Sequence, residues 1–315
     1  MTVEPEFPHS LIEFEEQFAT EEQCRDHLYR MRFPDGFRCP KCSETGFWWT
    51  ARQLLHCKGC GHQASLRAGT IMEQSKKPLR LWYRAFFLVA FQKQGISAKN
   101  LQAQLGFGSY QTAWTWLHKI RRAMRRPHRK GLAEVVEVDE ALYGGVAPGA
   151  PGRTPGAKQL VAVGAEVVGL RGIGRIRMEP IPDASSESLQ QFISANVKPG
   201  AAIWTDGWKP YKGAAKNYLH VPVTGALTSA KVLPRVHLIV SHCWRWLLGT
   251  HQGRVSRRHL QWYLDEFVFR FNRRTSRSRG KVFYRLLQQA ISHQATTYSE
   301  LVGKSSKSVP VPALT

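Results

Sequence analysis

The chain is short of acidic residues and of long apolar runs. Among its 315 residues, 23 Asp and Glu stand against 45 Lys and Arg, which gives a formal charge of +22. A surplus of this size predicts attraction to a polyanion, most commonly nucleic acid, and fits DNA-binding and RNA-binding proteins equally well. The longest apolar run, residues 85–91, is far too short to cross a bilayer. Since no long basic amphipathic helix stands out either, an anionic membrane is a disfavoured partner.

A secretory signal is also lacking at the start of the chain. The first residues, MTVEPEFPHS, are acidic and contain proline, whereas a signal peptide needs a basic start and an apolar stretch. We therefore expect a cytoplasmic protein, in which cysteine thiols are reduced.

Cysteine is scarce, but four of the six residues form two Cys-x-x-Cys pairs in FRCPKCSETGFWWTARQLLHCKGCGHQ. Each pair places two thiolates on one tight turn, and two such turns complete a tetrahedral zinc shell. Segments 47–49 and 54–56 read as short strands, so we predict a zinc ribbon; a redox dithiol is the alternative. Four thiolates leave no open position, which makes the Zn²⁺ structural. The predicted ligands are Cys39, Cys42, Cys57 and Cys60. The other cysteines, Cys24 and Cys243, are expected to be packing thiols.

Helical spacing of apolar residues begins at 78, and segments 97–105 and 109–124 flank the sequence GFG. Two helices joined by a short glycine turn predict a helix-turn-helix; an ordinary helical hairpin with an aromatic core is the alternative. The second helix carries side chains able to meet bases or backbone: Tyr110, Gln111, Thr112, Trp114, Thr115 and His118.

Basic residues follow this pair of helices, at 121–130. We predict that they contact phosphates, as would the arginines at 270, 273, 274, 277 and 279; a solvated charge run, or packing within a helix, is the alternative.

Two predicted strands end in acids. The segment VVEVDE, residues 135–140, ends in Asp139 and Glu140, and the segment AAIWTDG, residues 201–207, contains Asp206. An acid at the end of a hydrophobic strand is costly unless it binds something, and divalent metals take carboxylate oxygens. The alternatives are solvated strand-end acids and, for Asp206, a turn aspartate before Gly207.

The order of elements after residue 133 predicts an α/β domain with an RNase H-like sheet. In that topology the first strand and a later parallel strand lie side by side, so Asp139 and Asp206 would share divalent ions. Such ions activate a water or a 3′-hydroxyl and stabilise the leaving oxygen of a phosphodiester. The predicted elements are a strand at 135–140, strands at 160–168 and 174–180, a helix at 185–196, a strand at 201–206, and helices at 236–248, 257–272 and 283–292. Residues 212–234 read as irregular.

The four-cysteine ribbon, VEVDEALYGG, IWTDGWKPY and above all WLLGTHQGRVSRRHLQWYLDEFVFRFNRR resemble the IS1595-type insertion-sequence transposases, the group with an ISXO2-like transposase domain. The resemblance covers nearly the whole chain. It implies a DDE-type enzyme with an RNase H-like fold that cleaves DNA with Mg²⁺ or Mn²⁺ and transfers the strand into target DNA. It also implies Asp139 as the first acid and Asp206 as the second.

The same resemblance implies partners and a domain order. The ribbon and the helix-turn-helix would bind the element's terminal inverted repeats in double-stranded DNA, and the protein would act as a homo-oligomer, at least a dimer, at the bacterial nucleoid. The expected parts are an N-terminal helical segment at 1–30, the ribbon at 31–72, the helix-turn-helix and basic linker at 73–130, the catalytic domain at 131–300 and a disordered tail at 301–315. A Gly- and Pro-rich loop at 144–157 is expected to be mobile.

Enzymes of the DDE type place a third ligand on a helix that crosses the sheet. Counting from Asp206 leads to His237, 31 residues further on. A neutral imidazole nitrogen can ligate a metal, although it suits Mn²⁺ better than Mg²⁺. Glu266 and Asn272 are the rivals; Glu266 has the better chemistry, but it could instead be a structural acid paired with Arg270 one helical turn away. We predict His237 over Glu266.

One position departs from the family pattern. Relatives often carry a lysine five residues before the glycine of the GTHQG-like motif, and here that residue is Trp244, seven residues after His237 and on the same helix face. The departure keeps open a second hypothesis, a catalytically inactive zinc-ribbon DNA-binding protein derived from a transposase. A structural RNA-binding protein is a third, and the paired strand-end acids argue against it.

Overall fold

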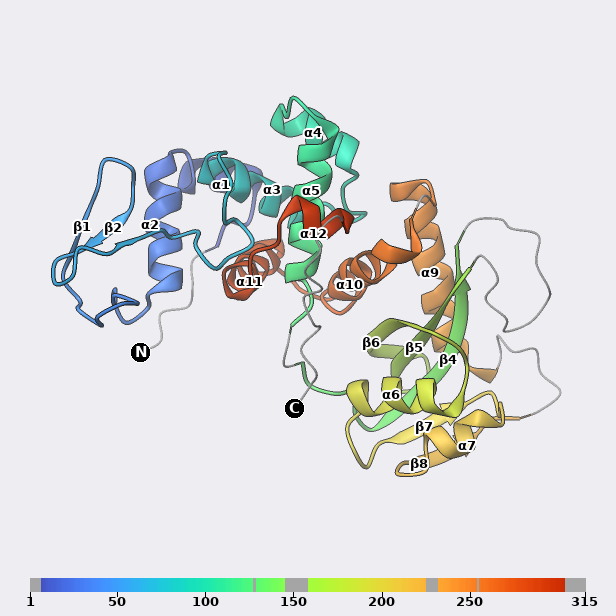
Figure 1. The fold of residues 1–315 in the computed structure, drawn as a ribbon. Coiled ribbons are helices and arrows are strands. Elements are labelled where there is room, and N and C mark those ends of the chain that lie inside the picture. The colour runs from blue at the N-terminus through green and yellow to red at the C-terminus, as the bar shows by residue number, and fades with distance from the viewer. Residues whose placement is uncertain (1–6, 127–128, 145–157, 225–231, 254, 304–315) are drawn as a thin grey trace. The chain divides into compact units, whose positions relative to one another are not determined.

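A computed structural model describes residues 7–126, 129–144, 158–224, 232–253 and 255–303. The chain divides into two compact units (Figure 1). Unit 1 comprises Met1–Met124 and Ser276–Thr315, and unit 2 comprises Arg125–Thr275. The predicted mobile loop, apart from its first residue, and nearly all of the predicted disordered tail lie outside the described residues.

Unit 1 begins with two short helices and a small sheet. Helix α1 spans Leu11–Gln17 and α2 spans Glu21–Arg32. Helix α2 starts with a capping box, in which the Thr20 hydroxyl and the Gln23 side chain each accept a bond from the other residue's backbone N–H. The ribbon strands form an antiparallel sheet in the order β1-β2-β3, with bounds Phe47–Trp49, Leu55–Cys57 and Gln63–Ala64.

The helices predicted between 78 and 126 are present in unit 1. They are α3 (Leu79–Phe91), α4 (Ala98–Leu105) and α5 (Tyr110–Ala123). Gly106 ends α4 at φ 63°, a left-handed conformation that glycine adopts without strain. The ring of Trp82 in α3 stacks on that of Trp116 in α5 with centroids 3.7 Å apart. His118 is fully buried, which contradicts the expectation that it meets DNA, because its position on α5 faces the core.

The last helices of the chain belong to unit 1. These are α11 (Arg279–Ser292), which packs on α3, and α12 (Tyr298–Val302), which packs on α5. Phe283 lies edge-on to Phe14 of α1, with ring centroids 5.8 Å apart, and Gln289 donates a 2.6 Å hydrogen bond to the Ala123 carbonyl. The packing of α11 and α12 in unit 1 differs from the single domain 131–300 expected from the sequence. The partners of α11 precede it by more than 150 residues, so no local sequence pattern indicates them.

Unit 2 is built on a mixed sheet with the strand order β6-β5-β4-β7-β8. Strands β4, β5 and β6 are antiparallel neighbours, whereas β7 runs parallel to β4 and β8 runs parallel to β7. The prediction that the strand after residue 134 lies beside a later parallel strand is therefore confirmed. The strands span Val135–Tyr143, Gln159–Val168, Gly172–Ile181, Ala202–Thr205 and Leu219–Pro222.

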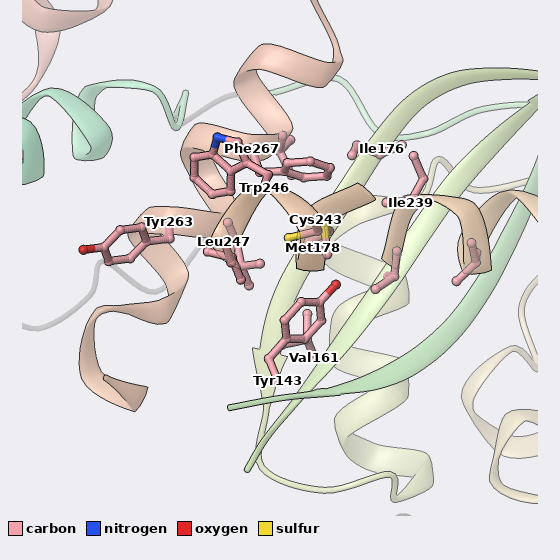
Figure 2. Packing of buried hydrophobic residues seen from close by; sticks show 14 of the residues in the cluster. Tyr143, Val161, Ile176, Met178, Ile239, Cys243, Trp246, Leu247, Tyr263 and Phe267 are labelled. Carbon is pink, nitrogen blue, oxygen red and sulfur yellow. The ribbon is translucent and has the colours of Figure 1, made fainter. Parts of the chain in front are cut away.

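Helices cover both faces of this sheet (Figure 1). On one face α6 (Ser186–Asn196) and α7 (Pro210–Ala214) pack over Val136 and Val138. On the other face α9 (Pro234–His251) and α10 (Leu260–Phe271) enclose a core with Tyr143, which Figure 2 shows. A single 3₁₀ turn, Arg257–His259, precedes α10. Since side chains alternate along a strand, Glu137 and Asp139 share the face covered by α9.

Two short elements of unit 2 were not predicted. Residues 212–234 were expected to be irregular, but α7 ends within them, β8 lies wholly inside them and α9 begins at Pro234. Strand β8 has the sequence LHVP, with four residues and a terminal proline, and it occupies the edge of the sheet. Such a short strand carries too little alternation to be recognised, and proline is tolerated there because an edge needs fewer backbone donors.

Candidate functional site

The four ribbon cysteines lie at one point in unit 1, as predicted. The Sγ atoms of Cys39 and Cys60 are 3.6 Å apart, those of Cys42 and Cys57 are 3.5 Å apart, and all four lie within 4.8 Å of one another. Tetrahedral thiolates around zinc, with bonds of about 2.3 Å, have sulfur atoms roughly 3.8 Å apart. The donor set therefore fits a structural zinc ion.

The two remaining cysteines are buried away from the ribbon cluster. Cys24 belongs to α2 and Cys243 to α9, and neither side chain is exposed to solvent. Burial raises the pKa of each thiol to about 12, so both remain protonated at neutral pH. These features agree with the expected packing role.

In unit 2, the predicted acids lie on and directly after two neighbouring parallel strands: Asp139 is in β4, and Asp206 follows Thr205, the last residue of β7. Glu137 of β4 pairs with Trp204 of β7 in the last pair of this ladder, and the same register continued by two residues would set Asp206 opposite Asp139. Side chains at matching positions of parallel neighbours point to the same face of a sheet. Asp139 is 7% exposed, and its Oδ1 accepts a 2.8 Å bond from the Glu140 amide. The Asp206 Oδ1 accepts a 3.0 Å bond from the backbone N–H of Trp208.

A buried tyrosine lies near the acids of this region. The Tyr211 hydroxyl of α7 donates a 2.7 Å hydrogen bond to Oε2 of Glu140, on the face opposite Asp139. Burial raises the pKa of Tyr211 well above its usual value near 10, and the negative charges of Glu140, Asp139 and Asp206 raise it further. Three carboxylates thus lie within electrostatic reach of one hydroxyl.

His237 lies beside the first of these acids. It belongs to the first turns of α9, and its Nε2 is 3.7 Å from Oδ2 of Asp139. The imidazole is 31% exposed, so a ligand can reach it from solvent. The structure thus brings His237 of α9 against Asp139, the fifth residue of β4, while Asp206 directly follows β7, the parallel neighbour of β4.

The rival residues lie over a different part of the sheet. Glu266 is buried in α10, which packs on the edge strand β6, and its Oε1 accepts bonds of 2.9 and 2.7 Å from Arg270. Asn272 bonds both backbone groups of Ile176 in β6. These contacts match the structural role that the sequence left open for Glu266, and they give Asn272 a role in joining α10 to the sheet.

Trp244, in the position where relatives often carry lysine, packs on the sheet. Its ring is nearly parallel to that of Tyr143, at an interplanar angle of 9° and a centroid distance of 5.2 Å. Burial, followed by the neighbouring Cys243, raises the pKa of Tyr143 well above its usual value. The lysine position is therefore occupied here by an aromatic contact between α9 and β4.

Several arginines expected to contact phosphates have partners inside unit 2. Arg270 pairs with Glu266, and the guanidinium of Arg273 lies 3.8 Å from the centroid of the Phe269 ring. Arg274 lies 3.9 Å from the Phe271 ring centroid. For these residues the structure supports packing within the helix, which was the alternative.

A buried ion pair next to His237 escaped the sequence analysis. Glu137 belongs to the strand VVEVDE and Arg235 is the second residue of α9, and their side chains are bonded at 2.8 Å. The available signal was an acid placed in the middle of a β-branched run, where burial demands a partner. Nothing in the sequence pointed to a partner 98 residues away.

No helix in the described part of the chain is both long and apolar enough to span a membrane.

Comparison with protein families identifies the class. The model of the ISXO2-like transposase domain matches residues 131–272, and that of the transposase zinc-ribbon domain matches residues 19–63. These matches define the chain as a transposase. Within that class it belongs to the IS1595 transposases, as both matching models do, and the resemblance noted in the sequence is confirmed.

Other comparisons add little. No curated protein matches the chain significantly. Among solved structures it is similar to a simian T-cell lymphotropic virus intasome in complex with PP2A regulatory subunit B56 gamma, at 14% identity and a TM-score of 0.31, over 58% of this chain and 70% of that one. It is also similar to a pre-cleavage Mos1 transpososome, at 14% identity and a TM-score of 0.27, over 74% of this chain and 81% of that one. TM-scores this low carry no weight.

Proposed function

We propose that this transposase cleaves DNA at the ends of its insertion sequence and transfers the strand into target DNA by DDE-type chemistry, with unit 2 as an RNase H-like catalytic domain. The strand order β6-β5-β4-β7-β8, with three antiparallel strands followed by two parallel ones, supports this topology. The observation that carries the proposal is the 3.7 Å approach of His237 to Asp139. The parallel pairing of β4 and β7 supports it, because the same register continued by two residues would set Asp206 opposite Asp139.

The donor set fits a divalent cation. Two carboxylates offer hard oxygen ligands, and the imidazole offers a nitrogen that Mn²⁺ accepts more readily than Mg²⁺ does. Bound cations would activate the attacking oxygen and neutralise charge on the leaving oxygen of the phosphodiester. The chain's own part is to hold Asp139, Asp206 and His237 in place, and we assign Glu266 to structural support of α10.

We assign DNA binding to unit 1. Helices α4 and α5, joined by the glycine turn, fit a helix-turn-helix in which Tyr110 and Gln111 at the start of α5 are exposed. Together with the zinc ribbon they would recognise the terminal inverted repeats. Two repeats must be processed together, so a dimer on double-stranded chromosomal DNA, in the cytoplasm of a bacterium, is the working state that we propose.

The decisive experiment is a nicking assay. The full chain is incubated with a duplex that carries DNA flanking its coding sequence, with Mg²⁺ or Mn²⁺, and the cut positions are mapped. Cleavage at the repeat ends by the wild type, and none by Asp139→Asn, is the expected result. Metal-dependent cleavage that survives in Asp139→Asn would exclude the proposed site.

A second candidate function is a DNA-binding protein without cleavage activity. The observation in its favour is Trp244, which stacks on Tyr143 where relatives often carry lysine. The same assay separates the two functions, because the second predicts repeat binding with no cleavage under either metal. A Trp244→Lys variant that gained cleavage would show that this position alone had silenced the site.

A further inference from the structure

Glu137 is a fully buried acid two residues before Asp139 on the same face of β4. Its Oε2 accepts hydrogen bonds from the backbone N–H groups of Arg235, at 2.8 Å, and Val236, at 3.0 Å. These are the second and third residues of α9, whose own N-cap, Leu233, has no side-chain acceptor. A strand carboxylate therefore caps α9, and its negative charge also complements the positive end of the helix dipole.

Arg235 completes this contact from the helix side. Its Nη1 donates to Oε1 of Glu137 at 2.8 Å, and its other donors bind two carbonyls of the turn between β5 and β6 and the carbonyl of the first residue of β6. These carbonyls belong to Gly169 at 3.1 Å, Leu170 at 2.7 Å and Gly172 at 2.9 Å. A guanidinium presents its donors in a rigid planar fork, so four simultaneous bonds fix the side chain and the helix turn that carries it.

The consequence is a fixed register between α9 and β4. Glu137 holds the helix at Arg235 and Val236, and the next helical residue, His237, then meets the next strand residue on that face, Asp139. If the first turn of α9 frayed or shifted by one residue, the imidazole would leave Asp139. The 3.7 Å approach therefore depends on the buried pair beneath it.

We propose that Glu137 and Arg235 are positioning residues that hold His237 against Asp139 for metal binding. The inference rests on the proposed function, since it assumes that Asp139, Asp206 and His237 ligate a divalent cation. Neither residue touches the metal or the DNA. Their contribution is the placement of the third ligand, which the two carboxylates cannot replace.

Binding of Mn²⁺ alone to the zinc-loaded full chain tests this positioning role, without DNA and without catalysis. Electron spin echo envelope modulation detects an imidazole nitrogen bound to Mn²⁺, and we expect that signal in the wild type and its loss in His237→Gln. Glu137→Gln and Arg235→Lys should still bind Mn²⁺ through Asp139 and Asp206. They should lose the nitrogen signal and bind about 10-fold more weakly, as expected for lost support of a ligand.

A matched control separates positioning from general stability. Arg175 of β6 also pairs with a glutamate, Glu166, at 2.5 Å, and also bonds a carbonyl, that of Gly131 at 2.9 Å. Arg175→Lys removes the same guanidinium fork elsewhere in unit 2. It should lower the unfolding midpoint and leave both the Mn²⁺ affinity and the nitrogen signal unchanged.

The remaining outcomes are distinguishable. A nitrogen signal that persists in folded Glu137→Gln and Arg235→Lys overturns the positioning role and leaves the proposed function standing. Unfolding of both variants, seen by circular dichroism, assigns the pair to stability alone and also overturns it. If Asp139→Asn leaves Mn²⁺ binding unchanged, the proposed metal site itself is wrong, and the positioning role is overturned with it.

Discussion

The Nε2 atom of His237 lies 3.7 Å from Oδ2 of Asp139, although the two residues are 98 positions apart in the chain. An imidazole and a carboxylate at this separation can share one cation. We expect His237→Glu to shift the metal preference of cleavage from Mn²⁺ toward Mg²⁺, since a third carboxylate supplies a harder ligand. Cleavage rates measured with each metal give the ratio of Mn²⁺-supported to Mg²⁺-supported activity. An unchanged ratio in an active variant would remove His237 from the ligand set.

The two strand acids give the clearest loss of activity. Asp139→Asn and Asp206→Asn keep the shape of each side chain and remove its charge, so each should reduce cleavage at least about 100-fold through loss of metal binding. Gel-shift titration should show DNA affinity within about twofold of the wild type. Glu266→Gln serves as the contrast: it should lower thermal stability while Mn²⁺ affinity stays unchanged.

Zinc should be required for unit 1 and not for unit 2. Cys57→Ser removes one of four ligands, so zinc measured by mass spectrometry should fall from about one ion per chain to near zero, with weaker DNA binding. Cys243→Ser provides the control because it alters a buried thiol in unit 2, and it should retain the zinc. Retention of a full zinc ion by Cys57→Ser would contradict the four-cysteine site.

DNA affinity should fall steeply as salt rises. The logarithm of the binding constant should lose about 0.9 per decade of salt for each phosphate that the protein neutralises. Replacing the exposed Lys93, Lys99 and Lys130 with Gln should reduce this slope by about that amount for each lysine that contacts a phosphate. Arg273→Gln should leave the slope unchanged, because Arg273 packs on Phe269. A flat wild-type dependence would argue against DNA binding.

Asp265 should make the stability of unit 2 depend on pH. Burial raises its pKa from 3.8 to about 6, while Gln261 donates a 2.9 Å bond to its Oδ1 and the positive charges of Arg125 and Arg129 oppose the shift. Because the folded-state pKa is raised, the folded protein holds the proton more tightly, and stability falls as pH rises from about 4 through 6. Relative to Asp265→Asn, the wild type should lose up to about 3 kcal/mol over this window. Urea unfolding at pH 4 and pH 7 measures the difference.

Local chemistry explains which features the sequence could predict. The capping residues Thr20 and Ser185 mark the starts of α2 and α6 through bonds made within one turn. Likewise the two Cys-x-x-Cys pairs carry their geometry in their spacing. The parallel pairing of β4 and β7 followed from the order of elements. A strand reached through a helix runs parallel to the strand before that helix, here β6, and the two antiparallel steps β4-β5-β6 make β6 parallel to β4.

The features that could not be predicted from the sequence depend on contacts between residues far apart in the chain. The bond between Glu137 and Arg235 joins residues 98 positions apart, and helical periodicity did not reveal that His118 is on the buried side of α5. The choice of His237 over Glu266 depended on counting from Asp206, and only the fold shows that Glu266 already has Arg270 as partner.

The return of α11 to unit 1 has a consequence for synthesis of the chain. Since unit 2 lies between the two segments of unit 1, the ribosome completes unit 2 before it releases the helix that covers the apolar side of α3. Until then the hydrophobic surface that receives Phe283, including Phe14, has no final cover. Domains generally fold as units during synthesis. A nascent or truncated chain that ends before residue 276 therefore holds a complete unit 2 and an incomplete, aggregation-prone unit 1.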